Sequence, residues 1–317
     1  MKYIDFHGTP LAQIALGCDH WGTNIPEAIA RKQLDIYTEM GGNLLDTAAI
    51  YGQEKAGGPS TSEQIIGEWL SSTNVRSELV IATKGCHPYK EDMHRSRISE
   101  REMIDDISRS LDQLKTDYVD IWYFHRDNLK MGTDEIIDLA QLLFDKKLIR
   151  HLGASNWKAA RIEAANRWAA DHNKQGFAIS EIQWSLAHCT PESWGDDTLV
   201  CMNESEHAWY TENNFPVMAF TSQAKGFYSK LISGNEKSLS EKARHRFLSE
   251  RNLALVPEVR ALSEELGVSA AAVVIAYLTS QKNPTIAIAG SSRVEQIVDT
   301  LSARDTTLSE EQMAALL

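Results

Sequence analysis

Short β-rich runs alternate with longer segments of helical period along the whole chain, and this alternation restricts the fold more than any other feature of the sequence. Such a pattern is typical of a parallel sheet covered by helices. The runs predicted as strands are residues 12–17, 43–46, 79–84, 119–124, 149–154, 179–182, 217–220 and 285–289. Eight parallel strands close a barrel. The sequence therefore predicts an α/β fold, a (β/α)8 TIM barrel with its active site at the C-terminal ends of the strands.

Amphipathic helices are predicted between these strands. In residues 99–115, the side chains of Ile104, Ile107 and Leu111 are spaced by three and four residues and so share one face. Three pairs of residues have the spacing of a capping box and predict helix starts: Ser60 with Glu63, Ser99 with Glu102, and Ser292 with Glu295.

The chain has 317 residues, a length that fits either two domains or one barrel with insertions. No low-complexity tract or Pro/Gly/Ser linker divides the sequence, so we favour a single domain over residues 1–317. Two stretches, 187–203 and 226–253, exceed the minimal strand–helix repeat. Both follow predicted strands, and we interpret them as insertions that cover the active site.

Composition limits the classes of partner. Hydrophobic residues make up 43% and charged residues 24% of the chain, which is typical of a globular protein. The net charge of −12 would repel nucleic acid and anionic lipid. No apolar run is long enough to span a membrane, and the first residues do not resemble a secretory signal, so we expect a cytoplasmic protein without a membrane partner.

The four cysteines are sparse and share no CxxC spacing; they are Cys18, Cys86, Cys189 and Cys201. Neither a disulfide framework nor a structural zinc site is therefore indicated, and reduced thiols are expected.

Four ionisable side chains lie at the ends of consecutive predicted strands. Asp46 ends one strand, Tyr51 follows in the same loop, Lys84 ends the next strand and His125 follows the one after. Each alone has an ordinary explanation as a helix cap, a solvated lysine or a hydrogen-bonded histidine. Together on one rim they form a consistent catalytic set.

The chemistry that this set suggests is proton donation by a phenol. A cation beside a tyrosine favours the phenolate and so lowers the tyrosine pKa from about 10. We therefore expect Tyr51 to be a general acid next to the Lys84 cation. Asp46 would hold Lys84, and His125 would orient a substrate carbonyl by hydrogen bonding.

The sequence resembles the aldo-keto reductase family over nearly its whole length. The resemblance is carried by LLDTAAIYG, LVIATK, YFHRDN, IRHLGASNW, residues 178–184 and TIAIAGSSRVEQI. It implies an eight-stranded barrel with an Asp, Tyr, Lys and His tetrad. It also implies a nicotinamide cofactor across the barrel mouth and an NAD(P)H-dependent oxidoreductase acting on CH–OH groups. Such an enzyme would reduce the carbonyl of a small aldehyde, ketone or sugar to an alcohol.

The resemblance also implies which residues contact the nicotinamide. Ser155 and Asn156 match the pair that bonds the carboxamide, although they could simply cap the next helix. Glu181 stands where the family usually has a glutamine, and Gln183, two residues on, would face the same side of the strand. An ionised glutamate there would favour the oxidised, positively charged ring. Phe220 matches the aromatic residue that stacks on the ring, although it could simply close the core.

The phosphate side of the cofactor is expected near the last predicted strand. GSSRVEQ follows that strand and opens a helix, whose N-terminus favours an anion. The resemblance implies that Ser291, Ser292 and Arg293 hold the 2′-phosphate of the cofactor, so NADP is expected rather than NAD, although Ser292 could simply cap the helix while Arg293 is solvated. The remaining predicted cofactor contacts are Gly17, Cys18, Lys225, Gly290, Ser291, Ser292, Arg293 and Gln296.

Trp21 is the predicted substrate contact. The chain ends soon after Ser309, and we expect no long C-terminal pocket loop. A first alternative is a regulatory subunit of the same fold that binds cofactor with little turnover. A second is a metal-dependent hydrolase that uses Cys86, His87 and His94, although these residues lack the spacing of common metal ligands.

Overall fold

The computed structural model describes residues 1–53 and 57–317. In this part of the chain, hydrogen bonds order eight strands as β10-β3-β4-β5-β6-β7-β8-β9 in a closed barrel. The strands are β3 (Ile14–Gly17), β4 (Leu44–Asp46), β5 (Val80–Gly85), β6 (Val119–Phe124), β7 (Ile149–Ser155), β8 (Phe177–Gln183), β9 (Val217–Phe220) and β10 (Thr285–Ala289). The predicted (β/α)8 TIM barrel is confirmed, with every predicted strand present and bounds that differ by at most a few residues.

An N-terminal hairpin that we did not expect from the sequence precedes the barrel strands. It pairs β1 (Tyr3–Phe6) with β2 (Thr9–Ala12) in an antiparallel register that places Phe6 opposite Thr9. His7 and Gly8 form the two-residue turn, with φ angles of 51° and 82°. Such turns need positive φ at both positions, and glycine adopts it without strain. The His-Gly dipeptide was the local signal for this hairpin.

Helices follow most of the barrel strands. They are α1 (Glu27–Glu39), α2 (Thr61–Thr73), α3 (Glu100–Leu114), α4 (Thr133–Asp145), α5 (Ala159–Asp171), α6 (Pro191–Trp194), α7 (Glu204–Glu212), α8 (Phe227–Ile232), α9 (Glu241–Phe247), α10 (Glu250–Ala254), α11 (Val256–Leu266), α12 (Ala270–Thr279), α13 (Val294–Leu301) and α14 (Glu310–Ala314). Short 3-10 turns are η1 (Arg76–Glu78), η2 (Ala224–Gly226), η3 (Glu236–Ser238) and η4 (Ser302–Asp305). Among the described residues, no single helix is long and apolar enough to span a membrane. One bent pair of helical segments, Glu250–Leu266 and Ala270–Thr279, reaches that length and hydropathy only when the two are taken together.

Two of the three predicted helix caps are confirmed. The side chains of Ser60 and Ser99 accept hydrogen bonds from the backbone N–H groups three residues on, as an N-cap residue does. The prediction for Ser292 is wrong, because the N-cap of α13 is Arg293. The Ser292 hydroxyl lies instead 3.4 Å from Oε1 of Gln296.

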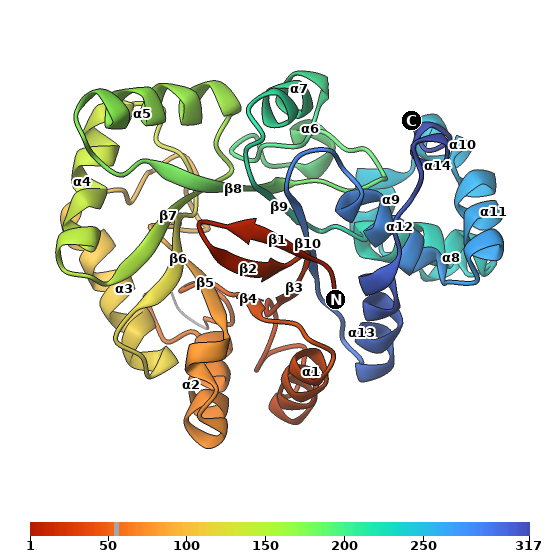
Figure 1. The fold of residues 1–317 in the computed structure, drawn as a ribbon, viewed down its shortest axis with the longest axis horizontal. Coiled ribbons are helices and arrows are strands. Elements are labelled where there is room, and N and C mark those ends of the chain that lie inside the picture. The colour runs from red at the N-terminus through yellow and green to blue at the C-terminus, as the bar shows by residue number, and fades with distance from the viewer. Residues whose placement is uncertain (54–56) are drawn as a thin grey trace. The chain divides into compact units, whose positions relative to one another are not determined.

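The described residues form two compact units. The first unit is Met1–Ala15, Ile36–Gly42 and Ile182–Leu317, and the second is Leu16–Asp35 and Asn43–Glu181. Within the second unit, helices α2 to α5 lie outside strands β4 to β7 (Figure 1). The single domain over residues 1–317 stays a prediction.

Both predicted insertions lie in the first unit and contain short helices. Residues 187–203 include α6, and residues 226–253 include α8, α9 and α10. The indole of Trp194 packs edge-on against Phe220, with ring centroids 6.0 Å apart. The Arg246 guanidinium covers the same indole at 3.7 Å. The two insertions therefore pack together beside the end of β9.

Candidate active site

The Lys84 side chain is the centre of a buried polar cluster in the second unit. Lys84 is only 1% exposed. Its Nζ donates to Oδ1 of Asp46 at 2.5 Å, to the Thr47 carbonyl at 3.1 Å and to the Tyr51 hydroxyl at 3.4 Å. Oε1 of Glu181 lies 3.3 Å from the same nitrogen. Three segments that are distant in sequence therefore meet at one ammonium group: β4 with its following loop, β5 and β8.

Lys84 keeps its positive charge despite this burial. Burial lowers the pKa of Lys84, but the nearby carboxyl groups of Asp46 and Glu181 raise it by more, so the net shift is upward. Removing a lysine and two carboxyl groups from water is costly, and such a cluster is weak evidence for stability. Strongly perturbed groups of this kind are instead typical of functional sites.

Tyr51 is held by the cap of the following helix. The Ser60 hydroxyl, which caps α2, also lies 2.7 Å from the Tyr51 carbonyl oxygen and 3.0 Å from that of Ala48. The Tyr51 backbone N–H donates to the same Ala48 carbonyl at 3.0 Å. The capping signal at Ser60 therefore fixes the loop that carries the predicted general acid.

The pKa of Tyr51 shifts in the direction opposite to our expectation. Burial is the largest effect and raises it, Lys84 lowers it as expected, and the carboxyl groups of Asp46 and Glu181 raise it again. The net pKa lies above the ordinary value for tyrosine. Tyr51 is therefore a neutral phenol, which is the form that can donate a proton.

His125 follows β6 and lies against two other rings. Its backbone N–H donates to the Gly85 carbonyl at 3.0 Å. Its imidazole packs edge-on against Tyr51 at 6.0 Å and against His87 at 4.5 Å between ring centroids. Burial, followed by the nearby His87, Arg126 and Lys84, holds the pKa of His125 well below its usual range. The imidazole is therefore neutral.

One ring nitrogen of His125 has no protein partner. Nδ1 is buried, and no described residue forms a hydrogen bond with it. An unpaired buried polar atom costs free energy unless a ligand or water satisfies it. His125 can therefore offer a hydrogen bond to a bound molecule beside Tyr51.

The predicted carboxamide contacts form one polar edge at the ends of β7 and β8. Ser155 pairs in register with Glu181, and the Asn156 backbone N–H donates to the Glu181 carbonyl at 2.8 Å. The Asn156 amide nitrogen lies 3.1 Å from the Ser155 hydroxyl. All three residues are buried. This arrangement offers several donors and acceptors to one amide group.

Glu181 is not the simple carboxylate that we assumed from the sequence. Burial and the neighbouring Asp46 raise the pKa of Glu181 to about 8, although Lys84 opposes the shift. At neutral pH the side chain is therefore mainly a neutral carboxylic acid. Its contact with Lys84 had no signal in the sequence.

Gly17, Cys18 and Trp21 lie beside the cluster in the second unit. Gly17 pairs in register with Asp46, and the Cys18 N–H donates to the Asp46 carbonyl at 2.9 Å. Trp21 is fully buried, and its carbonyl accepts a hydrogen bond from Thr61 at 2.5 Å. Contact of these three residues with cofactor or substrate stays a prediction.

The loop after β9 lies in the first unit and has an unusual backbone. Phe220 ends β9, and the following Thr221, Ala224 and Lys225 have φ angles of 52°, 49° and 57°. Non-glycine residues seldom adopt such angles, and functional sites are enriched in them. The Ser222 hydroxyl donates to the carbonyl of Ile288 on β10 at 2.6 Å. The loop that carries Phe220 and Lys225 is thereby tied to the last barrel strand.

Helix α13 also lies in the first unit and contacts this loop near its own C-terminal end. The amide of Gln223 donates to Thr300 on α13 at 2.9 Å. Arg293 is exposed at the N-cap, and no side chain of the described residues caps this helix. The unsatisfied N–H groups and the positive end of the helix dipole suit an anion. The segment includes the predicted contacts Gly290, Ser291, Ser292, Arg293 and Gln296.

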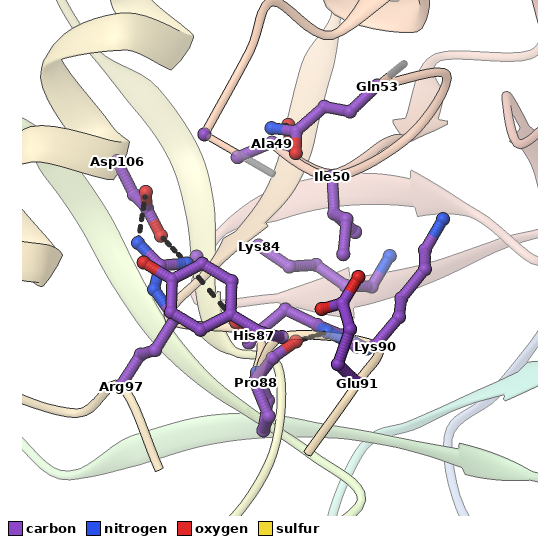
Figure 2. A pocket seen from close by; sticks show the side chains of 13 residues that line it. Ala49, Ile50, Gln53, Lys84, His87, Pro88, Lys90, Glu91, Arg97 and Asp106 are labelled. Atoms are coloured by element: carbon purple, nitrogen blue, oxygen red, sulfur yellow. Dashed lines mark hydrogen bonds and ion pairs between the residues drawn. The ribbon is translucent and has the colours of Figure 1, made fainter. Parts of the chain in front are cut away.

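A cavity of about 100 Å³ opens beside the polar cluster in the second unit. Its lining includes Ile50, Lys84, His87 and Lys90. Figure 2 shows Lys84 among the lining side chains and the hydrogen-bonded Arg97 and Asp106 at one side. The cavity has no signal in the sequence, because loops after two different strands must come together to form it.

Two further residues support the site. Asp106, on the buried face of α3, accepts a hydrogen bond from the Cys86 backbone N–H at 2.8 Å. An acidic residue on the apolar face of the predicted helix was the signal that could have found it. Nδ1 of His87 lies 2.6 Å from the Pro88 carbonyl oxygen. In residues 1–53 and 57–317, no group of three or more His, Cys, Asp or Glu residues could hold a metal ion, so the hydrolase alternative has no ligand set there.

Comparisons with known proteins find similar sequences that match nearly the whole chain. A family model described as "Aldo/keto reductase family" matches residues 13–316. An aryl-alcohol dehydrogenase (NADP+) of Phanerodontia chrysosporium is 28% identical, over 98% of this chain and 82% of that protein. The norsolorinic acid reductase stcV of Emericella nidulans is 24% identical, over 96% of this chain and 77% of that protein.

A solved structure has the same fold. It is the crystal structure of a thermostable aldo-keto reductase in complex with the inhibitor epalrestat. The TM-score is 0.74 at 21% sequence identity, and the match covers 100% of this chain and 98% of the other.

Proposed function

Because the chain belongs to the aldo/keto reductase family, we propose that it is an NADP(H)-dependent oxidoreductase that reduces the carbonyl group of a small aldehyde or ketone to an alcohol. The names of its relatives, an aryl-alcohol dehydrogenase and a norsolorinic acid reductase, favour an aromatic substrate. The observation that carries the proposal is the Lys84 ammonium, which is held by Asp46 at 2.5 Å and donates to the Tyr51 hydroxyl.

Tyr51 acts as the general acid. Its oxygen accepts from Lys84, so its own O–H is available to a substrate carbonyl. As the carbonyl oxygen gains negative charge, Tyr51 transfers its proton, and the Lys84 ammonium stabilises the phenolate that is left. In the tautomer that carries its proton on Nδ1, His125 donates a hydrogen bond to the same oxygen through this unpaired nitrogen. NADPH, when bound, supplies the hydride that reaches the carbonyl carbon.

The residues present fit a nicotinamide cofactor. Ser155, Asn156 and Glu181 would hold the carboxamide, because together they offer donors and acceptors at one edge. Phe220 would stack on the ring. Arg293 and the uncapped N-terminus of α13 would hold the 2′-phosphate that distinguishes NADPH from NADH.

The test is to follow the consumption of NADPH and of NADH with a panel of aromatic aldehydes, aliphatic aldehydes, ketones and aldoses. We expect turnover with NADPH that is fastest with aromatic aldehydes. Tight binding of NADPH without turnover of any carbonyl compound would contradict the proposal and favour a regulatory cofactor-binding protein. Failure to bind either cofactor would contradict both.

A further inference from the structure

We infer that Glu181 is a proton-exchanging positioning residue: it releases a proton when the oxidised nicotinamide cofactor binds and keeps that proton when the reduced cofactor binds. The preference of the site for oxidised or reduced cofactor would then depend on pH. This inference rests on the proposed function, because it requires the nicotinamide ring to lie beside the Lys84 cluster.

The first observation is that one ammonium serves two carboxyl groups. Lys84 Nζ lies 2.5 Å from Asp46 and 3.3 Å from Glu181. An ammonium has three N–H donors, and Lys84 also reaches the Thr47 carbonyl and the Tyr51 hydroxyl. Asp46 therefore makes the shortest contact with the ammonium. Glu181 competes with Thr47 and Tyr51 for the remaining N–H groups of Lys84.

The second observation is that the two acids crowd the same ammonium. Asp46 and Glu181 both contact Lys84, and the Asp46 carboxylate raises the pKa of Glu181. Oε2 of Glu181 is buried, and no described residue forms a hydrogen bond with it. A buried carboxyl oxygen without a donor favours the protonated acid. Since Asp46 lies closer to the ammonium, Glu181 is the acid that holds the proton.

The third observation is the charge balance of the cluster. The ionisable groups that face Glu181 are Asp46 from β4, Tyr51 from the following loop, Lys84 from β5 and Tyr123 from β6. Burial raises the pKa of both tyrosines, so both are neutral phenols. With Glu181 protonated the cluster is neutral, and with Glu181 ionised it carries one uncompensated negative charge, which is costly in a buried site.

A positively charged ring would compensate that charge. The oxidised nicotinamide ring is a cation, whereas the reduced ring is neutral. Glu181 pairs in register with Ser155 and accepts from the Asn156 N–H through its backbone, and these are the residues proposed to hold the carboxamide. Ring and carboxylate would therefore be neighbours, and their attraction would favour ionised Glu181 only with oxidised cofactor. By linkage, the oxidised cofactor then binds more tightly as pH rises.

The main experiment measures the dissociation constants of NADP+ and NADPH from the whole chain across a pH range on both sides of the pKa of about 8 of Glu181. In the unmodified protein, the ratio of the NADP+ constant to the NADPH constant should fall about tenfold with rising pH, which corresponds to a one-unit change in the Glu181 pKa on binding. In Glu181→Gln the ratio should not change with pH, because an amide does not titrate there.

Glu63→Gln is the matched control. Glu63 is also a buried glutamate, and burial raises its pKa to about 7. It bonds to Thr83 and Gln113 rather than to Lys84. Glu63→Gln should therefore keep the pH dependence of the unmodified protein.

A second measurement needs no variant. Calorimetric titration of the unmodified protein in two buffers with different ionisation enthalpies counts the protons exchanged on binding. Slightly below the pKa of Glu181, NADP+ should release a substantial fraction of a proton and NADPH should release none.

Equal proton exchange for both cofactors, or a pH-independent ratio of their constants, would overturn the inference and leave the proposed function intact. A pH-dependent ratio that persists in Glu181→Gln would assign the proton to another group. Absence of binding by both cofactors would overturn the inference together with the proposed function.

Discussion

Replacing Tyr51 with phenylalanine should separate catalysis from folding, because the hydroxyl makes only one long hydrogen bond with the described residues. Its partner there is the Lys84 ammonium at 3.4 Å. A typical hydrogen bond contributes about 0.5–1.5 kcal/mol to stability, and this long bond to a half-buried group belongs at the lower end. The ring contacts are kept: Lys84 Nζ is 5.1 Å from the ring centroid, and the His125 ring centroid is 6.0 Å away.

The effect of Tyr51→Phe on the rate of carbonyl reduction should be much larger than its effect on stability. Loss of a general acid costs about 10²- to 10⁴-fold in rate, and at about 1.4 kcal/mol per factor of ten this adds roughly 3–5.5 kcal/mol to the barrier. The barrier should therefore change several times more than the free energy of unfolding.

The assay compares kcat/KM for an aromatic aldehyde with NADPH binding and with urea unfolding, in Tyr51→Phe and in the unmodified protein. Lys84→Met is the companion variant. If Lys84 acts through the Tyr51 hydroxyl, the double variant should be no slower than the slower single variant, because the two effects are not additive. Unchanged kcat/KM in Tyr51→Phe would refute the assignment. A loss of activity that is matched by an equal loss of NADPH binding would show that the hydroxyl serves structure or cofactor binding instead.

Arg293→Ala should weaken NADPH binding about 10- to 100-fold, the equivalent of about 1.5–3 kcal/mol for a charge-assisted contact, and change NADH binding little; equal losses in titrations of the two cofactors would argue against a 2′-phosphate site. Glu63→Gln should become more stable relative to the unmodified protein as pH rises. Burial raises the folded-state pKa of Glu63 from 4.5 to about 7, so its stabilising contribution is present below pH 4.5 and is lost as pH rises to about 7. The difference should approach about 3 kcal/mol in urea unfolding above that range, and a constant difference across pH would contradict it. Gly67→Ala should destabilise the protein by about 1–3 kcal/mol in urea unfolding, because an added Cβ would lie 2.0 Å from the Gln113 backbone oxygen. This clash should outweigh the better helix propensity of alanine. A stabilised variant would contradict the prediction.

Local pattern was enough to determine the barrel and the positions of the tetrad. The barrel strands are short β-rich runs that are buried on both faces, as in β5 and β6, and helix starts are marked by caps such as Ser60 and Ser99. Once the strands were located, Asp46, Lys84 and His125 followed as neighbours, because the C-terminal ends of parallel strands in a barrel meet at one rim. Local signals failed at Ser292, where the cap is the next residue, and at the N-terminal hairpin.

Tertiary structure alone decided the protonation states. The pKa of Tyr51 rises because burial and two carboxyl groups outweigh one ammonium, and the sequence contains no measure of that balance. Glu181 and Lys84 lie on different strands, and their 3.3 Å contact depends on the barrel register. The same holds for His87 against His125, which come from loops after two different strands. A sequence pattern gives the face of the strand or helix on which a side chain lies. The charge of that side chain depends instead on its burial and on the other ionisable groups buried beside it. Only the folded chain brings those groups together.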